Sequence, residues 1–101
     1  MAYSADNELQ EELGVVEINS RGEYIIVKKI TNKSSGSVSI DIRRHYTDDE
    51  DVIKPTTKGL RIKDEVVPDV ILAAAKSIET TDLVDLIEKL SNIVEERDAE
   101  D

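Results

Sequence analysis

The chain has 101 residues, of which 23 are Asp or Glu and 13 are Lys or Arg, so its formal net charge is −10. This length predicts one domain with a small core. The sequence contains no cysteine, which excludes disulfides and thiolate metal sites and suits a reducing compartment.

The charge is distributed unevenly along the chain. Residues 1–19 contain five acidic and no basic residues, and residues 64–101 contain twelve acidic and three basic residues. Residues 20–63 instead contain ten basic and six acidic residues, and four of those six lie together at Asp48–Asp51. A basic middle lies between acidic ends, so the net charge alone does not exclude a nucleic-acid partner.

The first thirteen residues are acidic, polar and without a sustained apolar period. We therefore expect residues 1–13 to be an N-terminal tail. The same stretch has no apolar block, which argues against a secretory signal. The longest uninterrupted apolar run, Val70–Ala75, is too short to cross a membrane. These features predict a soluble, intracellular protein with no membrane partner.

Four stretches rich in β-branched residues and bounded by turn residues predict strands. They are residues 14–19, 23–31, 37–46 and 52–62. The connections between them read as turns at residues 20–22, 32–36 and 47–51. Pro55 cannot donate to a strand ladder, so the fourth strand is predicted to be an edge strand or to contain a bulge. Gly59 in the same strand predicts a bulge or a close backbone approach.

The third predicted strand alternates between apolar and polar residues. One face would carry Val38, Ile40 and Ile42. The other would carry Ser39, Asp41, Arg43 and His45. We expect this second face to be exposed, and we assign His45 no role.

After the fourth strand the hydrophobic period becomes helical. Asp64 is predicted to cap a first helix, with Pro68 near its start and apolar residues recurring over residues 67–78. Residues 80–82 read as a stop followed by a new cap. A second helix then carries one apolar stripe over residues 83–94 and an acidic opposite face.

This order of elements predicts an α+β fold, in which a four-stranded antiparallel sheet is followed by one or two C-terminal helices. We expect three parts: an acidic tail at residues 1–13, a ββββα domain at residues 14–79, and an extra acidic amphipathic helix and tail at residues 80–101. The helices would cover one face of the sheet and leave the other free. Because the core of so small a chain is marginal, the apolar stripe is also a candidate dimer element.

Basic side chains gather on the second, third and fourth predicted strands. The candidate nucleic-acid contacts are Lys28, Lys29, Lys33, Arg43, Arg44, Tyr46, Lys54 and Lys58. Arg61 lies on the same fourth strand. Neighbouring strands are about 4.8 Å apart, so these groups could share one curved surface. Single-strand binding needs positive groups that follow phosphates and a flat group that receives a base, and Tyr46 is the best candidate for the latter in a chain without Trp or Phe.

Simpler interpretations of the same residues stay open. The basic groups also suit solvated charges on an exposed sheet face, and Tyr46 also suits a core or rim aromatic. Asp48–Asp51 suggests a cation loop by composition, but it lacks the glycine and the terminal glutamate of a calcium loop, which favours a solvated turn. With one histidine, no cysteine and no phosphate-cradling glycine loop, we predict no enzyme activity, catalytic residue, cofactor or metal site.

Two motifs form a more specific pattern. Asp41-Ile42-Arg43-x-x-Tyr46 is followed, after seven residues, by Lys54-Pro55-x-x-Lys58-Gly59-Leu60. At this spacing, residues 23–79 resemble the positive cofactor four family of transcriptional coactivators, whose members bind single-stranded DNA.

The resemblance implies a curved sheet with a C-terminal helix, a symmetric homodimer, and DNA bound along the concave sheet surface and the hairpin of strands two and three. It also implies roles for single residues. Arg43, Lys54 and Lys58 match basic contact positions, Tyr46 matches a stacking tryptophan, Lys28 matches a basic position on strand two, and Lys33 belongs to a hairpin that is rich in lysine.

The chain departs from the family pattern in three ways. Its hairpin is longer and lacks the aromatic that relatives carry there. A tyrosine, Tyr46, replaces tryptophan, which should weaken stacking. The helix at residues 82–96 lies beyond the usual end of the family. The short length of the chain suggests a bacterial or bacteriophage relative. For such a protein, replication, recombination or repair is the expected setting by analogy.

The sequence therefore predicts a homodimer that binds single-stranded DNA, or unwound duplex, without sequence preference. It would act in DNA replication or recombination, or as a transcriptional coactivator. The expected compartment is the cytoplasm or nucleoid, the host cytoplasm for a viral protein, or the nucleus for a eukaryotic one. The alternative is a protein-interaction module that works through the C-terminal amphipathic helix. In a third hypothesis, the acidic segment from Asp82 onward competes with DNA for the basic sheet or docks replication or transcription proteins.

Overall fold

The computed structural model describes residues 7–100 of the chain. It contains two compact units that divide between Val67 and Pro68. The first unit is a β-sheet and the second consists of helices. The sequence instead predicts a boundary after residue 79; here both long helices belong to the second unit.

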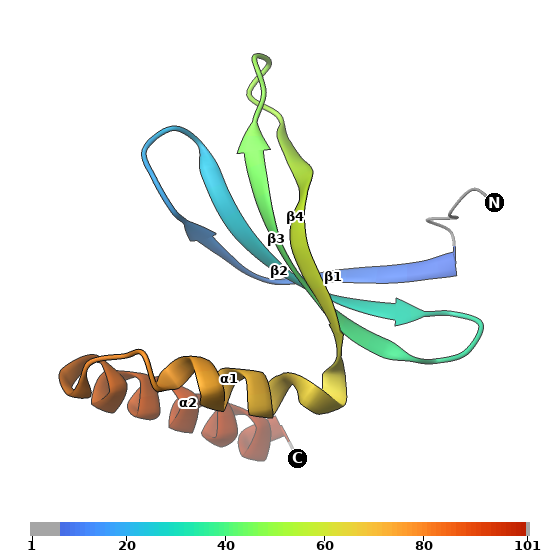
Figure 1. The fold of residues 1–101 in the computed structure, drawn as a ribbon. Coiled ribbons are helices and arrows are strands. Elements are labelled where there is room, and N and C mark those ends of the chain that lie inside the picture. The colour runs from blue at the N-terminus through green and yellow to red at the C-terminus, as the bar shows by residue number, and fades with distance from the viewer. Residues whose placement is uncertain (1–6, 101) are drawn as a thin grey trace. The chain divides into compact units, whose positions relative to one another are not determined.

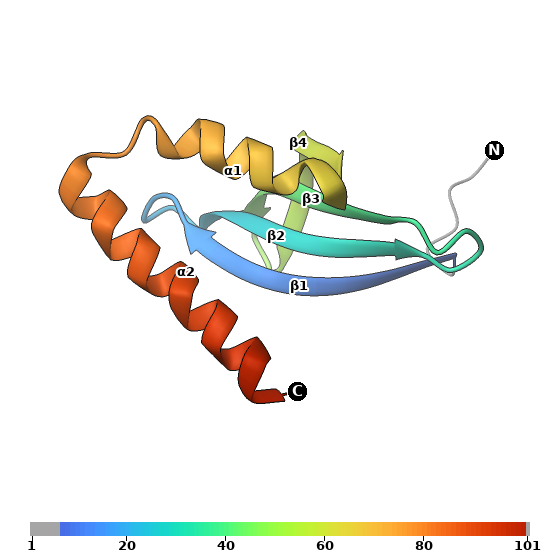
Figure 2. The ribbon, with the colours of Figure 1, turned by 90° about the horizontal axis from the view of Figure 1, so that it is seen from below.

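The first unit is one antiparallel sheet in the strand order β1-β2-β3-β4 (Figure 1). Its strands are β1 (Glu8–Glu17), β2 (Glu23–Asn32), β3 (Val38–Thr47) and β4 (Ile53–Lys63). Each strand pairs with the next strand along the chain, so short turns suffice for every connection. The sheet is curved, as Figure 2 shows for β1, β2 and β3. The predicted α+β class with a four-stranded antiparallel sheet is confirmed.

The first strand begins earlier than predicted. β1 starts at Glu8, so the prediction of a tail is wrong for residues 8–13, and residues 1–6 of that tail lie outside the described residues. The sequence hides this strand because, between residues 8 and 13, only Leu9 and Leu13 are apolar. Strand pairing uses backbone N–H and C=O groups, so it does not require apolar side chains. The edge of β2 would otherwise leave a row of such groups unpaired, and β1 pairs with them. A register shift between Glu12 and Gly14 gives β1 a bulge.

The strand register assigns each side chain to one of two faces, because directly paired residues point to the same side of a sheet. We call the face that carries the buried side chains the inner face. Those buried side chains are Ile26, Ile30, Asp41 and His45. The prediction that His45 is exposed is wrong: it is 3% exposed, and its Nδ1 lies 3.0 Å from the carbonyl oxygen of Arg43.

The opposite face, which we call the outer face, is mainly apolar around the middle of the sheet. Val27, Ile42 and Leu60 form one row across β2, β3 and β4, and Ile40 and Ile62 pair in the next row. This confirms the predicted separation of Val38, Ile40 and Ile42 from the polar residues of the same strand. The inner face is therefore the polar one, although it holds the buried residues.

The fourth strand contains the irregularity that its proline predicts. β4 is an edge strand, and its register with β3 shifts between the pairs Arg43–Gly59 and His45–Pro55. Extra residues of β4 are accommodated there, and Thr56 Oγ1 donates a 2.8 Å hydrogen bond to the carbonyl oxygen of Arg44. The predicted edge position and bulge are both confirmed.

The helices begin differently from the prediction. A 3₁₀ turn, η2 (Asp64–Val66), follows β4, and no side chain caps it, so Asp64 is not the predicted cap. α1 (Val67–Ala75) then has Pro68 in its first turn, where a missing N–H costs no helical hydrogen bond. α2 (Thr80–Glu100) begins within residues 80–82, where the sequence predicts a stop followed by a new cap.

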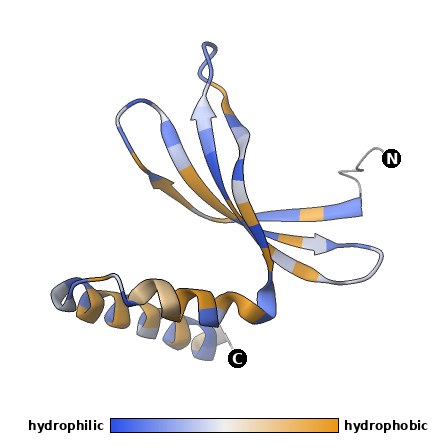
Figure 3. Ribbon diagram, viewed as in Figure 1, coloured by the Kyte–Doolittle hydropathy of each residue, from blue (hydrophilic) through white to orange (hydrophobic). Residues whose placement is uncertain are grey.

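Both helices contain hydrophobic residues, which Figure 3 colours orange, and several of their side chains are exposed. In α1, Ile71 and Leu72 are 47% and 65% exposed. In α2, the stripe predicted over residues 83–94 includes Ile87 and Leu90, which are 56% and 41% exposed. Within residues 7–100, no helix combines the length and apolar character needed to cross a membrane.

Candidate nucleic-acid interface

Basic side chains from three strands meet around a hollow in the inner face. The hollow has a volume of about 170 Å³. Its lining includes Lys28 of β2, Arg43 of β3 and Arg61 of β4, together with the buried residues Asp41 and His45. The other lining residues are Gln10, Ile30 and Pro55. Three basic groups therefore surround one carboxylate at this place.

Asp41 is the anchor of the hollow. Its carboxylate accepts hydrogen bonds from Arg43 Nη2 at 3.0 Å and Arg43 Nε at 3.2 Å, and Arg61 Nε lies 3.4 Å from the same carboxylate. Burial raises the pKa of Asp41, but the hydrogen bonds and positive charges of Arg43 and Arg61 outweigh this effect and hold the pKa below its ordinary value of 3.8. Asp41 therefore stays ionised and orients two arginines.

Arg43 is fixed on both sides. Besides its two hydrogen bonds to Asp41, its Nη1 donates a 3.0 Å hydrogen bond to the carbonyl oxygen of Thr56. Its side chain lies across Gly59, where an added Cβ would stand 2.8 Å from Arg43 Cγ and 2.7 Å from Arg43 Cζ. The close approach predicted from Gly59 is thus confirmed, and it is made by an arginine.

Lys28 differs from the two arginines because its amine has no ion-pair partner among residues 7–100. The register places Glu12, Lys28, Asp41 and Arg61 in one row across the four strands of the inner face. Lys28 is therefore the lysine of the hollow that is available to an external anion.

Four other predicted contact residues lie on the outer face. They are Lys29, Arg44, Tyr46 and Lys54. The expectation that all the basic groups share one surface is therefore wrong, because consecutive residues of a strand point to opposite faces. Lys28 and Lys29 are separated in this way, and so are Arg43 and Arg44.

The charged groups of the outer face are largely paired with carboxylates. Arg44 Nε donates a 3.0 Å hydrogen bond to Glu23, and Lys54 Nζ lies 2.8 Å from Asp48. A hydrogen bond from Asn19, followed by that from Arg44, holds the pKa of Glu23 below its ordinary value of 4.5. Tyr46 is 41% exposed and pairs with Lys54 across the strands, so its ring is open to solvent on this face.

Lys33 and Lys58 lie in irregular backbone. Lys33 is in the β2–β3 turn, where its N–H donates to the carbonyl oxygen of Asn7 at 2.8 Å. Lys58 precedes Gly59 in the bulged part of β4, and its N–H lies 3.1 Å from Thr56 Oγ1. Neither amine forms an ion pair within residues 7–100. Both lysines are thus also available to an external anion.

The acidic turn at Asp48–Asp51 is closed by its own backbone. Asp48 Oδ1 accepts hydrogen bonds from the N–H groups of Glu50 at 2.8 Å and Val52 at 3.0 Å. A hydrogen bond from Lys54 is the main cause that lowers the pKa of Asp48. Asp51 adopts a left-handed φ of 61°. In the part of the chain that the structure describes, no group of three or more acidic or histidine side chains could hold a metal ion.

Sequence reasoning missed two residues of this site. The sequence places Arg61 among the basic groups of the fourth strand but not among the candidate contacts, although its register opposite Asp41 makes it a neighbour of Arg43. Glu8 was assigned to a tail, yet its Oε2 lies 3.2 Å from Arg61 Nη1. Strand pairing was the missing signal in both cases.

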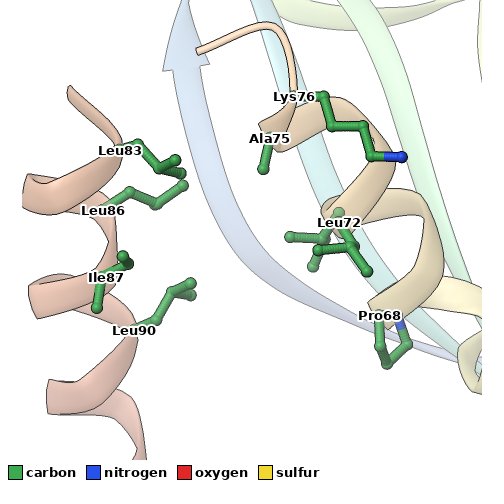
Figure 4. Close-up of a pocket in the computed structure, with 9 residues that line it drawn as sticks. Pro68, Leu72, Ala75, Lys76, Leu83, Leu86, Ile87 and Leu90 are labelled. Atoms are coloured by element: carbon green, nitrogen blue, oxygen red, sulfur yellow. The ribbon is translucent and has the colours of Figure 1, made fainter. Parts of the chain in front are cut away.

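A second surface lies within the helical unit. The facing sides of α1 and α2 line an open apolar groove of about 620 Å³ (Figure 4). Leu72 and Ala75 of α1 face Leu83, Ile87 and Leu90 of α2 across this groove. Its lining is apolar except for Lys76.

Comparison of the chain with protein-family models, with curated proteins and with solved structures finds no match.

Proposed function

We propose that this protein binds single-stranded DNA, or unwound duplex, without sequence preference and as a homodimer. The observation that carries this proposal is the convergence of Lys28, Arg43 and Arg61, from three strands, on one hollow of the inner sheet face. A phosphate group suits such a place, because arginine presents a planar fork of donors and lysine presents a compact charge.

The charge balance of the hollow supports an anionic ligand. Three basic residues outnumber the single acidic residue of its lining, and Lys28 has no ion-pair partner among residues 7–100. Lys33 and Lys58 would extend the path of the phosphates beyond the hollow. Backbone contacts of this kind are independent of sequence, since every nucleotide presents the same phosphate.

Tyr46 is our candidate for stacking on a base. It is 41% exposed and lies beside Lys54 on the outer face, so it would serve a part of the strand that passes over the edge formed by β4. A base stacked on an aromatic ring contributes about 1–3 kcal/mol. With one such ring per subunit, phosphate contacts supply most of the affinity.

The same proposal includes membership of the positive cofactor four family and a role in DNA replication or recombination, or in transcriptional coactivation. Its support is the pair of motifs at Asp41–Tyr46 and Lys54–Leu60, together with the curved four-stranded sheet and the helices that follow it. The corresponding compartment is the cytoplasm or nucleoid of a bacterium, with the host cytoplasm as its viral equivalent.

A second copy of this chain is the proposed occupant of the apolar groove. Only Ile26 and Ile30 are buried apolar residues among residues 7–100, so the chain alone buries little apolar surface. Exposed apolar patches of this extent on a small chain are typical of an interface. A two-fold symmetric pair would bury the same patch on both subunits.

The test is a titration of a fluorescently labelled oligo-dT with the full chain at two salt concentrations. We expect binding at low salt and a log–log slope of about −0.7 for each phosphate contacted. Absence of binding at low salt, or binding that does not change with salt, would contradict the proposal.

The rival function is a protein-interaction module, which the apolar groove of α1 and α2 favours. Replacing Lys28 and Lys58 together by Gln discriminates the two functions. Our proposal predicts that DNA binding is lost while the mass of the dimer in solution is unchanged. The rival predicts that the biological function survives this double change and is lost when the groove is altered.

A further inference from the structure

An ion pair joins the two edge strands of the sheet across its inner face. Glu8 lies on β1 and Arg61 on β4, and Glu8 Oε2 is 3.2 Å from Arg61 Nη1. The residue of β1 in the same row as Arg61 is Glu12, four positions further along the strand. In a flat sheet, three strand spacings and four residue steps would separate Glu8 and Arg61 by roughly 20 Å. The strong curvature of the sheet therefore makes this contact.

The contact places an acidic side chain on a residue of the proposed phosphate site. Arg61 lines the hollow with Lys28 and Arg43. The Nε of Arg61 lies 3.4 Å from Asp41 Oδ1. The side chain of Glu8 is 10% exposed, so it is largely withdrawn from water when it meets Arg61. A phosphate that approached Arg61 would compete with this carboxylate.

The Glu8–Arg61 pair is less complete than the Asp41–Arg43 pair beside it. Arg43 binds both oxygens of Asp41, at 3.0 and 3.2 Å. Glu8 uses Oε2 for Arg61, and its other oxygen, Oε1, is buried with no hydrogen-bond partner among the described residues. A buried carboxylate oxygen without a partner is costly, so part of the stabilisation from the ion pair is offset. This pair is therefore the easier of the two to break.

We propose that Arg61 binds a phosphate in the complex and that Glu8 occupies Arg61 in the free protein. Nucleic acid must then displace Glu8 from Arg61 to bind fully. This inference rests on the proposed function. Arg61 then has two states: paired with Glu8 in the free protein, and paired with a phosphate in the complex. Asp41 orients Arg61 in both states, because it contacts the Nε of Arg61 and leaves Nη1 to exchange partners.

Glu8 of β1 would therefore compete with nucleic-acid phosphates for Arg61. The free energy of breaking the Glu8–Arg61 pair is subtracted from the free energy of binding, so the pair weakens the binding of every strand whose phosphate reaches Arg61. Glu8 is the first residue of β1, so a local release of this end from β2 would free it and leave the pairing beyond the Glu12–Gly14 bulge in place.

The experiment compares the full-length chain with its Glu8→Gln and Glu11→Gln variants in titrations of labelled oligo-dT at low salt. Glu11 is the matched control, because it lies on the same strand, is exposed, pairs with Lys29 on the outer face and makes no ion pair among residues 7–100. Each variant removes one negative charge, so an effect of net charge alone would raise both affinities. We expect Glu8→Gln to bind about two- to fivefold more tightly than Glu11→Gln, the range of a modest ion pair.

Equal affinities of the two variants would overturn the competition by Glu8 and leave the proposed function intact. Binding by Glu8→Gln alone, with none by the unchanged chain, would support the competition in its strongest form. Absence of binding by all three proteins would overturn both the proposed function and the inference that rests on it.

Discussion

At the scale of single residues, Asp41 organises the inner face. It is 4% exposed and ionised, and it holds Arg43 and Arg61 in the orientation that lines the hollow. An isolated buried carboxylate would be destabilising, so the two arginines are the reason that the sequence tolerates it there. The same contacts give Asp41 a structural role that its place in the sequence motif Asp41–Tyr46 would not reveal.

Replacing Asp41 by Asn tests this role through the pH dependence of stability. The pKa of Asp41 is lowered in the folded chain, so its contribution to stability is present above 3.8 and is lost as the pH falls through the lower folded-state pKa. We expect Asp41→Asn to lower the free energy of unfolding at pH 7 by about 1–3 kcal/mol. Urea unfolding should also show a weaker dependence of stability on pH below 4 than in the unchanged chain.

The control for this measurement is Asp49→Asn, because Asp49 is exposed and makes no ion pair within residues 7–100. This variant should show the same dependence of the free energy of unfolding on pH as the unchanged chain. The lowered pKa values of Glu23 and Asp48 also contribute to that dependence. An Asp41→Asn curve parallel to that of Asp49→Asn would show that Asp41 is not anchored by its arginines.

At the scale of elements, the sequence predicted β2, β3 and β4 and missed the first half of β1. The three later strands contain many β-branched residues, whereas residues 8–13 are mostly polar and pair through their backbone. The faces of β3 followed from its alternation. The two faces of β2 could not be assigned in this way, because Ile25, Ile26 and Val27 put apolar groups on both sides. The faces of Lys28 and Lys29 therefore stayed unassigned. The Glu8–Arg61 contact runs diagonally across the sheet, so no local pattern signals it.

The bulge of β4 is the element that positions Arg43. We expect Gly59→Ala to lower the free energy of unfolding by about 1–3 kcal/mol, because the added Cβ overpacks the site. That Cβ would stand 2.9 Å from Arg43 Cβ, which a rotation of the side chain cannot relieve. Thermal or urea unfolding measures the loss of stability.

Gly14→Ala is the matched control for Gly59→Ala. Gly14 lies beside the bulge of β1, and an added Cβ there would meet nothing within 4 Å. Its effect on stability should be small. Equal losses in the two variants would mean that the cost arises from strand backbone in general and not from contact with Arg43.

At the scale of the whole molecule, we expect a dimer that depends on the groove of the helical unit. Ile87 lines this groove and is 56% exposed, so Ile87→Lys should leave the helix intact and place a charge in the interface. We expect the solution mass to fall from that of two chains to that of one, as measured by sedimentation or light scattering.

Val84→Lys provides the comparison for Ile87→Lys. Val84 is an exposed β-branched residue of the same helix, at 62%, but it does not line the groove. It should keep the mass of two chains. Dissociation by both changes would show that the interface is not confined to the groove, and a mass of one chain for the unchanged protein would reject the dimer.

The central claim is that nucleic acid binds the inner face, and Lys28 and Lys29 test it most directly. These adjacent lysines lie on opposite faces of β2, and neither forms an ion pair within residues 7–100. Labelled oligo-dT would be titrated with the unchanged chain, Lys28→Gln and Lys29→Gln over a range of salt concentrations. We predict that Lys28→Gln weakens binding and makes the log–log salt slope shallower by about 0.7, the contribution of one phosphate contact, whereas Lys29→Gln leaves both nearly unchanged. Equal losses in the two variants, or a larger loss for Lys29→Gln, would contradict the account.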